Sequence, residues 1–307
     1  MINFKPYDGD AFELYKGAVE RKDNGPDKDA LLRIEEKVCK SYETYQTAFN
    51  DQRVHLLNQD DSYAYDEKRL MKALYGSKAK VVKDIRAWID GNNKRTYLRK
   101  CPYCTISRAN TTEHILPKEK YPEYAVNALN LLPCCSDCNS AKGDKVRDED
   151  GNPLIINFYY HRLPNVQYLF VRLFEDENGY IDFEYYLDDS NHEVEESMFR
   201  LIQNHFTNLG LLGKFEEEAV CNYTEIENKL KNSASECGVE KCLEDLQKNA
   251  LEDAKEYGTN HWKVVLKLAL AKSKWYAEYL EKQIMTKALD ATTGQAIFYQ
   301  KIGKLFL

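Results

Sequence analysis

Residues 101–144 read CPYCTISRANTTEHILPKEKYPEYAVNALNLLPCCSDCNSAKGD, and this stretch decides how the chain folds. The pair Cys101 and Cys104 opens it, and the pair Cys135 and Cys138 stands near its end. A two-residue spacer lets both thiolates of a tight turn face one ion, so two such pairs can close a tetrahedral site around zinc. The sequence therefore predicts one structural Zn²⁺ held by these four side chains.

The segment between the two cysteine pairs is longer than the roughly 15–20 residues of a simple zinc ribbon, so it carries something more. It contains Glu113 and His114, and later Asn130, which begins a short apolar run. Asn139 follows the last cysteine directly. Cys134, which adjoins the second pair, is interpreted as a strand residue, because Cys135 has the correct pair spacing.

This arrangement resembles the HNH, or ββα-metal, nuclease family in its zinc-ribbon form. The family pattern is C-x-x-C, an acid-His pair, a mid-motif Asn, and then C-x-x-C-N-x-x-K, and residues 101–144 fill every position of it. Glu113 stands where Asp is commoner, which keeps a carboxylate. The resemblance implies a metal-dependent endonuclease that hydrolyses phosphodiester bonds in DNA.

The roles that the resemblance implies agree with the chemistry of the residues. Phosphodiester hydrolysis needs an activated water and a cation, and a His with a pKa near 6.5 can take a proton from water at neutral pH. His114 would be this base, Glu113 and Asn139 would bind one Mg²⁺ or Mn²⁺, and Asn130 would hold the loop and orient His114. The candidate substrate-binding cations are Lys118, Lys142 and Lys145.

One difficulty arises from strand geometry. Neighbouring side chains of a strand point to opposite faces, so Glu113 and His114 need a twist or bulge at the strand end to reach one phosphate.

Within the family, the chain is similar to the HNH subunits of Septu-type and retron-linked bacterial anti-phage systems. The similarity lies in residues 101–104, 113–118, 121–122, 130–132 and 138–144. It implies a defence role beside a partner ATPase. Further along, residues 155–160 are comparable to a segment of these relatives, but Phe158 stands where Pro is expected.

The formal charge of the chain is −7, yet its distribution is uneven. Between Lys94 and Arg147 there are ten Lys or Arg and five Asp or Glu, so the motif lies in a basic island. This island is compatible with DNA, and RNA is not excluded. The excess of positive charge is small for tight DNA binding by this chain alone. Part of the affinity is therefore expected to come from a partner protein, and a homo-oligomer is possible.

Hydrophobic periodicity predicts helices over 27–50, 66–89, 198–212, 215–230, 243–254 and 261–280. Two alternating runs, 167–174 and 180–187, flank an Asn-Gly turn and predict a β-hairpin. The expected fold class is α+β, mostly helical, with a small ββα-metal core and a following hairpin. The expected domains are a helical region 1–92, the nuclease core 93–150, the hairpin segment 151–190 and a helical region 191–307.

Two further expectations concern location and the alternative functions. The chain shows no signal peptide and no apolar run of the roughly 20 residues that a membrane helix requires, which predicts a cytoplasmic protein without a membrane partner. The main alternative is a non-catalytic zinc ribbon that binds nucleic acid or protein. A second is a scaffold whose helical arms do the work while the nuclease core is vestigial.

Overall fold

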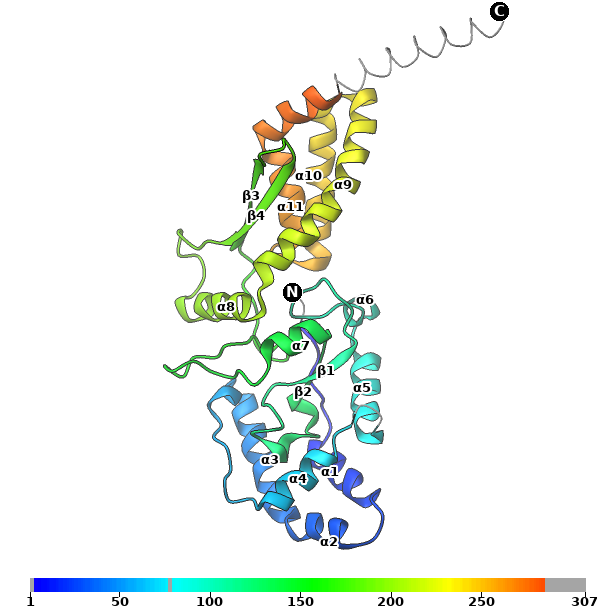
Figure 1. Ribbon diagram of the computed structural model, residues 1–307, viewed down its shortest axis with the longest axis vertical. Coiled ribbons are helices and arrows are strands. Elements are labelled where there is room, and N and C mark those ends of the chain that lie inside the picture. Colours follow the sequence, from blue (N-terminus) through cyan, green and yellow to red (C-terminus); the bar gives the residue numbers. More distant parts are fainter. Residues whose placement is uncertain (1–2, 77–78, 285–307) are drawn as a thin grey trace, which may run out of the picture. The chain divides into compact units, whose positions relative to one another are not determined.

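The computed structural model describes residues 3–76 and 79–284 and divides into two compact units (Figure 1). The first unit combines Met1–Pro164 with His192–Leu211, and the second combines Asn165–Asn191 with Leu212–Leu307. Residues 285–307, the last part of the predicted helical region 191–307, lie outside the described residues. The predicted division into four domains stays a prediction.

The helices and strands of the first unit are α1 (Ala11–Glu20), α2 (Pro26–Arg33), α3 (Glu35–Asn50), η1 (Val54–Leu56), α4 (Tyr65–Ala73), α5 (Lys80–Asn92), α6 (Arg95–Leu98), β1 (Thr111–His114), η2 (Pro122–Tyr124), η3 (Ala128–Asn130), β2 (Leu131–Cys134), α7 (Ser136–Lys142) and α8 (Glu196–Leu209). Those of the second unit are β3 (Leu169–Glu175), β4 (Ile181–Leu187), α9 (Leu211–Cys237), α10 (Val239–Tyr257) and α11 (Trp262–Lys272), and residues 274–284 are also helical.

The α+β fold class is confirmed. Helical residues make up 56% of the described part of the chain, which also forms two separate antiparallel sheets of two strands each. Four predicted helices are interrupted. The helix expected over 198–212 is divided between α8 and α9 at Gly210, which is left-handed with φ 60°, and the helix expected over 261–280 is broken at Ser273, which is extended with ψ 113°. The helix expected over 27–50 is α2 and α3, because Ile34 leaves helical geometry with φ −96° and ψ 1°. The helix expected over 66–89 is α4 and α5, and Gly76, a poor helix former, stands in the connection.

The small ββα element of the first unit follows the predicted order. β1 pairs with β2 without a bulge, so that Glu113 lies opposite Leu132 and His114 opposite Leu131. α7 begins directly after β2, with Cys135 as its N-cap. All four residues of β2 are buried, and Cys134 is the last of them, which confirms its interpretation as a strand residue.

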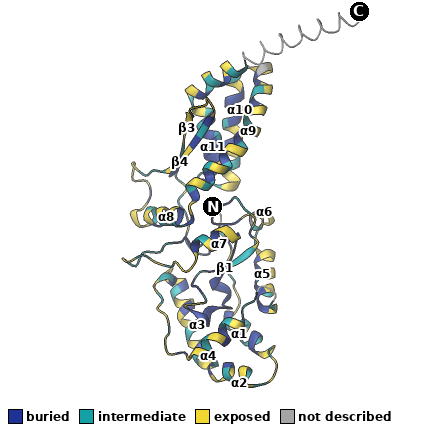
Figure 2. Ribbon diagram, viewed as in Figure 1, coloured by how far each residue is buried: buried dark blue, intermediate teal, exposed yellow. Residues whose placement is uncertain are grey.

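The surrounding helices of the first unit are amphipathic. On α5 the buried positions are Val81, Val82, Ile85 and Ile89, a spacing that places them on one face of a helix of 3.6 residues per turn. Figure 2 shows the same division on the other helices, with buried positions in dark blue facing inward and exposed positions in yellow. This packing surrounds the ββα element with apolar side chains.

In the second unit, β3 and β4 form the predicted hairpin. Its turn is closed by the Asp176 carboxylate, which accepts from the backbone N–H groups of Asn178 (2.9 Å) and Tyr180 (2.8 Å). Gly179 takes a φ of 83°, a left-handed conformation that favours glycine. The hairpin packs through β3 against α11, which also packs along α10.

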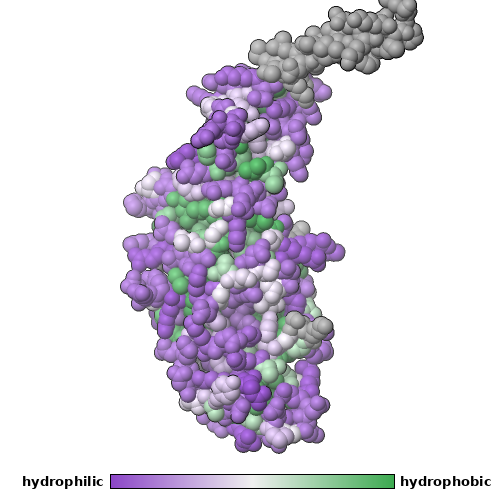
Figure 3. Space-filling view, viewed as in Figure 1, coloured by the Kyte–Doolittle hydropathy of each residue, from purple (hydrophilic) through white to green (hydrophobic). Residues whose placement is uncertain are grey.

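Among the described residues, no helix combines the length and the apolar character needed to cross a membrane. The face drawn in Figure 3 is mostly hydrophilic, with smaller apolar areas between.

Candidate active site and metal centre

Four cysteines gather at one point of the first unit. The Sγ atoms of Cys101, Cys104, Cys135 and Cys138 all lie within 4.8 Å of one another, and all four residues are buried. None is in a disulfide, and the Sγ atoms of Cys104 and Cys135 are 3.9 Å apart. A tetrahedral Zn²⁺ with Zn–S bonds of about 2.3 Å separates its sulfurs by about 3.8 Å. The cluster therefore fits the predicted zinc ion in ligand type, number and spacing.

Backbone hydrogen bonds shape both cysteine turns. The N–H of Thr105 donates to the Cys101 carbonyl (2.8 Å), and Thr105 adopts a left-handed φ of 59°. In the second turn the N–H of Cys138 donates to Cys135 Sγ (3.4 Å). A thiolate accepts such a bond better than a thiol does. These bonds hold each cysteine pair in a tight turn, which brings its two sulfurs to one side.

His114, the last residue of β1, is held in one orientation. Its Nε2 lies 3.0 Å from the Ala125 carbonyl oxygen, and its ring meets that of Tyr75 edge to face with centroids 4.3 Å apart. A carbonyl only accepts, so Nε2 carries the proton and Nδ1 keeps the lone pair. Burial lowers the pKa of His114 to about 4, which keeps the ring neutral at pH 7. The arrangement presents one nitrogen able to accept a proton.

Asn130 binds the loop between β1 and β2 from inside. Its Oδ1 accepts from the N–H of Leu116 (2.7 Å), and its Nδ2 donates to the carbonyls of Leu116 (3.0 Å) and Tyr124 (3.1 Å). The Tyr45 hydroxyl donates to the same Oδ1 (3.1 Å). Tyr124 immediately precedes the residue whose carbonyl binds His114. These contacts hold the loop in place, and the role predicted for Asn130 in orienting His114 stays a prediction.

Glu113 and Lys142 form an ion pair inside the first unit. Lys142 Nζ lies 2.7 Å from Glu113 Oε1, and the two side chains are 2% and 4% exposed. The same ammonium donates to the His114 carbonyl (2.9 Å). Burial raises the pKa of Glu113, and the charge of Lys142 opposes this rise. Lys142 thus ties α7 to β1, a placement that favours a structural role over the phosphate contact predicted from the sequence.

We expect Lys142→Ala to lower the free energy of unfolding by about 3–5 kcal/mol, because it leaves the Glu113 carboxylate buried without a partner. Chemical denaturation measures the change. The double variant Glu113→Gln/Lys142→Met removes both charges and should recover most of the loss. Lys120→Ala is the control: it breaks an exposed pair with Asp144 (2.6 Å), which water already screens. Equal losses in the two alanine variants would contradict the structural role of Lys142.

The remaining predicted site residues lie on α7, directly after it, or in the loop between β1 and β2. Asn139 is half-buried on α7, three residues before Lys142, so the two share one side of the helix. Lys118 pairs with Glu119 (2.9 Å) in the loop, and Lys145 is exposed just after α7. The roles predicted for Asn139, Lys118 and Lys145 stay predictions.

Glu123 in η2 is a second buried carboxylate of the same loop. It is 2% exposed, and its Oε2 has no hydrogen-bond partner within the described part of the chain. Burial raises the pKa of Glu123 from 4.5 to about 7. Its ionised form is therefore disfavoured in the folded protein, so this residue weakens the fold as the pH rises from about 4.5 to about 7.

We expect Glu123→Gln to stabilise the protein at pH 8 by roughly 3 kcal/mol, at about 1.4 kcal/mol per pKa unit, and much less at pH 5. Urea denaturation at the two pH values measures this. Glu119→Gln is the contrasting variant, because Lys72 and Lys118 lower the pKa of Glu119 to about 2. Its ionised form is stabilising above its unfolded pKa, so its removal should destabilise at pH 8. A Glu123→Gln gain that is the same at both pH values would contradict the titration of Glu123.

Several contributors to the site come from the helical flank and were not predicted. Tyr75 packs on His114, Tyr45 binds Asn130, and Arg86 of α5 donates to the carbonyls of Ala109 (3.0 Å) and Thr111 (3.3 Å). The sequence contains 22 tyrosines, but this abundance does not indicate which of them contact the site, and nothing in the sequence indicates Arg86.

Comparison with known proteins gives two partial matches. The chain is 26% identical over 187 residues to protein ea31 of Escherichia phage lambda, a match that covers 57% of this chain and 62% of that protein. It is 43% identical over 61 residues to the Septu protein PtuB of Bacillus thuringiensis, covering 18% of this chain and 23% of that protein.

No family model matches the chain, and no solved structure matches it. Each of the two matches above spans less than two thirds of the relative's length. The chain is similar over a short stretch to a Septu protein, and it carries a buried four-cysteine cluster that fits zinc.

Proposed function

We propose that the chain is a zinc-stapled HNH endonuclease that hydrolyses phosphodiester bonds of DNA, with His114 as general base. In this reaction Nδ1 of His114 takes a proton from water while the water oxygen attacks phosphorus. The bond from phosphorus to the leaving oxygen breaks and that oxygen takes a proton from solvent water, giving a phosphomonoester and a free hydroxyl, while His114 returns its proton to solvent. The neutral ring and its fixed orientation supply the base in the required form.

The observation that carries the proposal is the joint placement of His114 and the cysteine cluster. β1 ends at His114, β2 runs back to Cys134, and the second cysteine pair begins α7. Zinc bound there would fix the helix that bears Asn139 and Lys142. A zinc ribbon without catalysis needs no histidine oriented by a buried carbonyl.

A divalent cation is part of the proposal. Glu113 and Asn139 would hold one Mg²⁺ or Mn²⁺, ions that use one or two carboxylates and take further ligands from water and phosphate. When bound, the ion supplies charge for the scissile phosphate and the leaving oxygen. In the structure Glu113 is buried and its Oε1 pairs with Lys142.

The similarity to a Septu protein supports a role in bacterial defence against phage, and we extend the proposal to a partner ATPase. The similarity to a phage protein is compatible with a role that involves nucleic acid. A defence nuclease must be inactive until it is needed. The small positive charge of the basic island gives weak DNA affinity by itself, so a partner that adds affinity would also control when the nuclease binds DNA.

The test is cleavage of a supercoiled plasmid by the wild-type chain with Mg²⁺ or Mn²⁺, alone and with the candidate ATPase. The His114→Ala variant is assayed alongside. We expect metal-dependent nicking by the wild type only. If a folded, zinc-loaded wild type cuts neither DNA nor RNA under any of these conditions, the proposal fails and the zinc-ribbon or scaffold alternative replaces it.

A further inference from the structure

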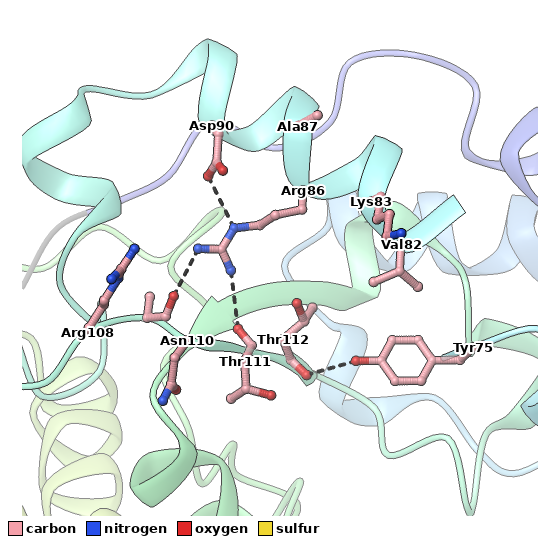
Figure 4. A pocket seen from close by; sticks show the side chains of 11 residues that line it. Tyr75, Val82, Lys83, Arg86, Ala87, Asp90, Arg108, Asn110, Thr111 and Thr112 are labelled. Atoms are coloured by element: carbon pink, nitrogen blue, oxygen red, sulfur yellow. Dashed lines mark hydrogen bonds and ion pairs between the residues drawn. The ribbon is translucent and has the colours of Figure 1, made fainter. Parts of the chain in front are cut away.

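A pocket of about 610 Å³ lies between α5 and the start of β1, in the first unit. Arg86 crosses it, donating to the carbonyls of Ala109 and Thr111 and pairing with Asp90 (3.2 Å), while the Tyr75 hydroxyl donates to the Thr112 carbonyl (3.3 Å). Figure 4 shows these contacts along the wall of the pocket. They use up the backbone acceptors there, so the pocket is not a template for another strand.

The pocket carries positive charge that has no counterion. Its lining includes three cations, Lys83, Arg86 and Arg108. It also includes one anion, Asp90, which forms an ion pair with Arg86. Lys83 and Arg108 are exposed, and within residues 3–76 and 79–284 no carboxylate pairs with either. In Figure 4 Arg108 lies at one end of the pocket and Lys83 at the other. Two separated, unpaired cations suit a ligand with repeated negative charges.

The lining between the two cations is also rich in neutral hydrogen-bonding groups. Asn110, Thr111 and Thr112 line it; the two threonines are neighbours on β1, so only one of their hydroxyls can face the pocket, and the Asn110 Oδ1 accepts from the Ser136 N–H (3.1 Å). Cations together with hydroxyl and amide donors are the groups that proteins use to bind phosphate and sugar oxygens.

The pocket adjoins the proposed catalytic histidine. Tyr75 lines the pocket and is also the ring that packs against His114. Thr112, another lining residue, is two positions before His114 on β1, so both lie on the same side of that strand. The pocket therefore shares Tyr75 with the surroundings of His114, although His114 itself does not line it.

We infer that this pocket binds the phosphodiester backbone of the strand that is cut, next to the scissile phosphate. The inference rests on the proposed nuclease function and adds a substrate contact made by the helical flank, through Lys83 of α5 and Arg108. The ligand is recognised by its phosphates and sugars, so contact here does not depend on base sequence.

The test measures binding in the His114→Ala background, so that cleavage does not interfere. Fluorescently labelled duplex and single-stranded oligonucleotides are titrated across a range of salt concentrations. Lys83→Ala/Arg108→Ala should raise Kd roughly tenfold or more, and its salt slope should be shallower by about 1.8 for duplex or about 1.4 for a single strand. Lys83→Gln/Arg108→Gln keeps polar side chains and should show the same change in slope.

The matched control is Arg33→Ala/Lys274→Ala, which also removes one arginine and one lysine from exposed positions, neither of which lines the pocket. Zinc content and Tm confirm that each variant is folded. Equal salt slopes in the pocket and control variants would overturn the inference, even if the wild type cuts DNA. A pocket-dependent slope in a protein that never cuts would keep the binding site and remove the nuclease proposal.

Discussion

Cys135→Ser is expected to remove the zinc ion and unfold the ββα element. Structural zinc contributes about 10–16 kcal/mol of apparent folding free energy in zinc-finger peptides, and a hydroxyl does not replace a thiolate as its ligand. The element itself is short, since β1 and β2 have four residues each and α7 has seven. We therefore expect zinc content to fall from one per chain to none and the main thermal transition to move down or broaden.

Cys134→Ser is the matched control, because it makes the same chemical change at the adjacent buried cysteine, which is not part of the cluster. This variant should keep its zinc and lose only about 1–3 kcal/mol for a buried hydroxyl. Elemental analysis and calorimetry of the two variants give the answer. Full zinc occupancy and an unchanged Tm in Cys135→Ser would disprove the structural role of the ion.

His114→Ala is expected to lower the cleavage rate by about 10²–10⁴-fold, the contribution typical of a positioned general base. Zinc content should not change, because His114 is not among the four ligands. The wild type and the variant are compared in single-turnover cleavage, which isolates the chemical step from product release.

Two further measurements separate catalysis from packing at this position. His114→Gln keeps a donor for the Ala125 carbonyl but has no basic nitrogen, so it should be folded and equally inactive. Added imidazole should restore part of the activity of His114→Ala by entering the space beside Tyr75. Wild-type rates in either variant, or loss of zinc from His114→Ala, would show that this histidine is not the base.

The sequence predicted the parts of the molecule that depend on short spacings. The two cysteines of each pair are separated by two residues, so their convergence within the pair follows from local turn geometry. The hairpin followed from the Asn178-Gly179 turn, and the helices followed from their periodicity. The breaks at Ile34 and near Gly76 were not predicted, since the apolar pattern continues across them.

The contacts that define the candidate site could not be predicted, because they join distant positions. Nothing local indicates that Lys142 reaches back to Glu113, or that the Ala125 carbonyl binds His114. β1 has no bulge, so the side chains of Glu113 and His114 point to opposite faces of the strand. Glu113 meets Lys142 of α7, and the His114 ring packs against Tyr75, which follows α4.

The first unit is discontinuous in the chain, and α8 completes it. His205 of α8 packs edge to face on Tyr103, one of the two residues between Cys101 and Cys104, with centroids 5.3 Å apart. Its Nδ1 accepts from the Ile156 N–H (3.2 Å). On the ribosome, the chain from Pro164 to Leu211 takes roughly 2–10 s to be made at about 5–20 residues per second. A nascent chain therefore bears all four cysteines and His114 for seconds before α8 is made. Products that end before α8 should consequently lack the contact of His205 with Tyr103 and the hydrogen bond that His205 accepts from Ile156.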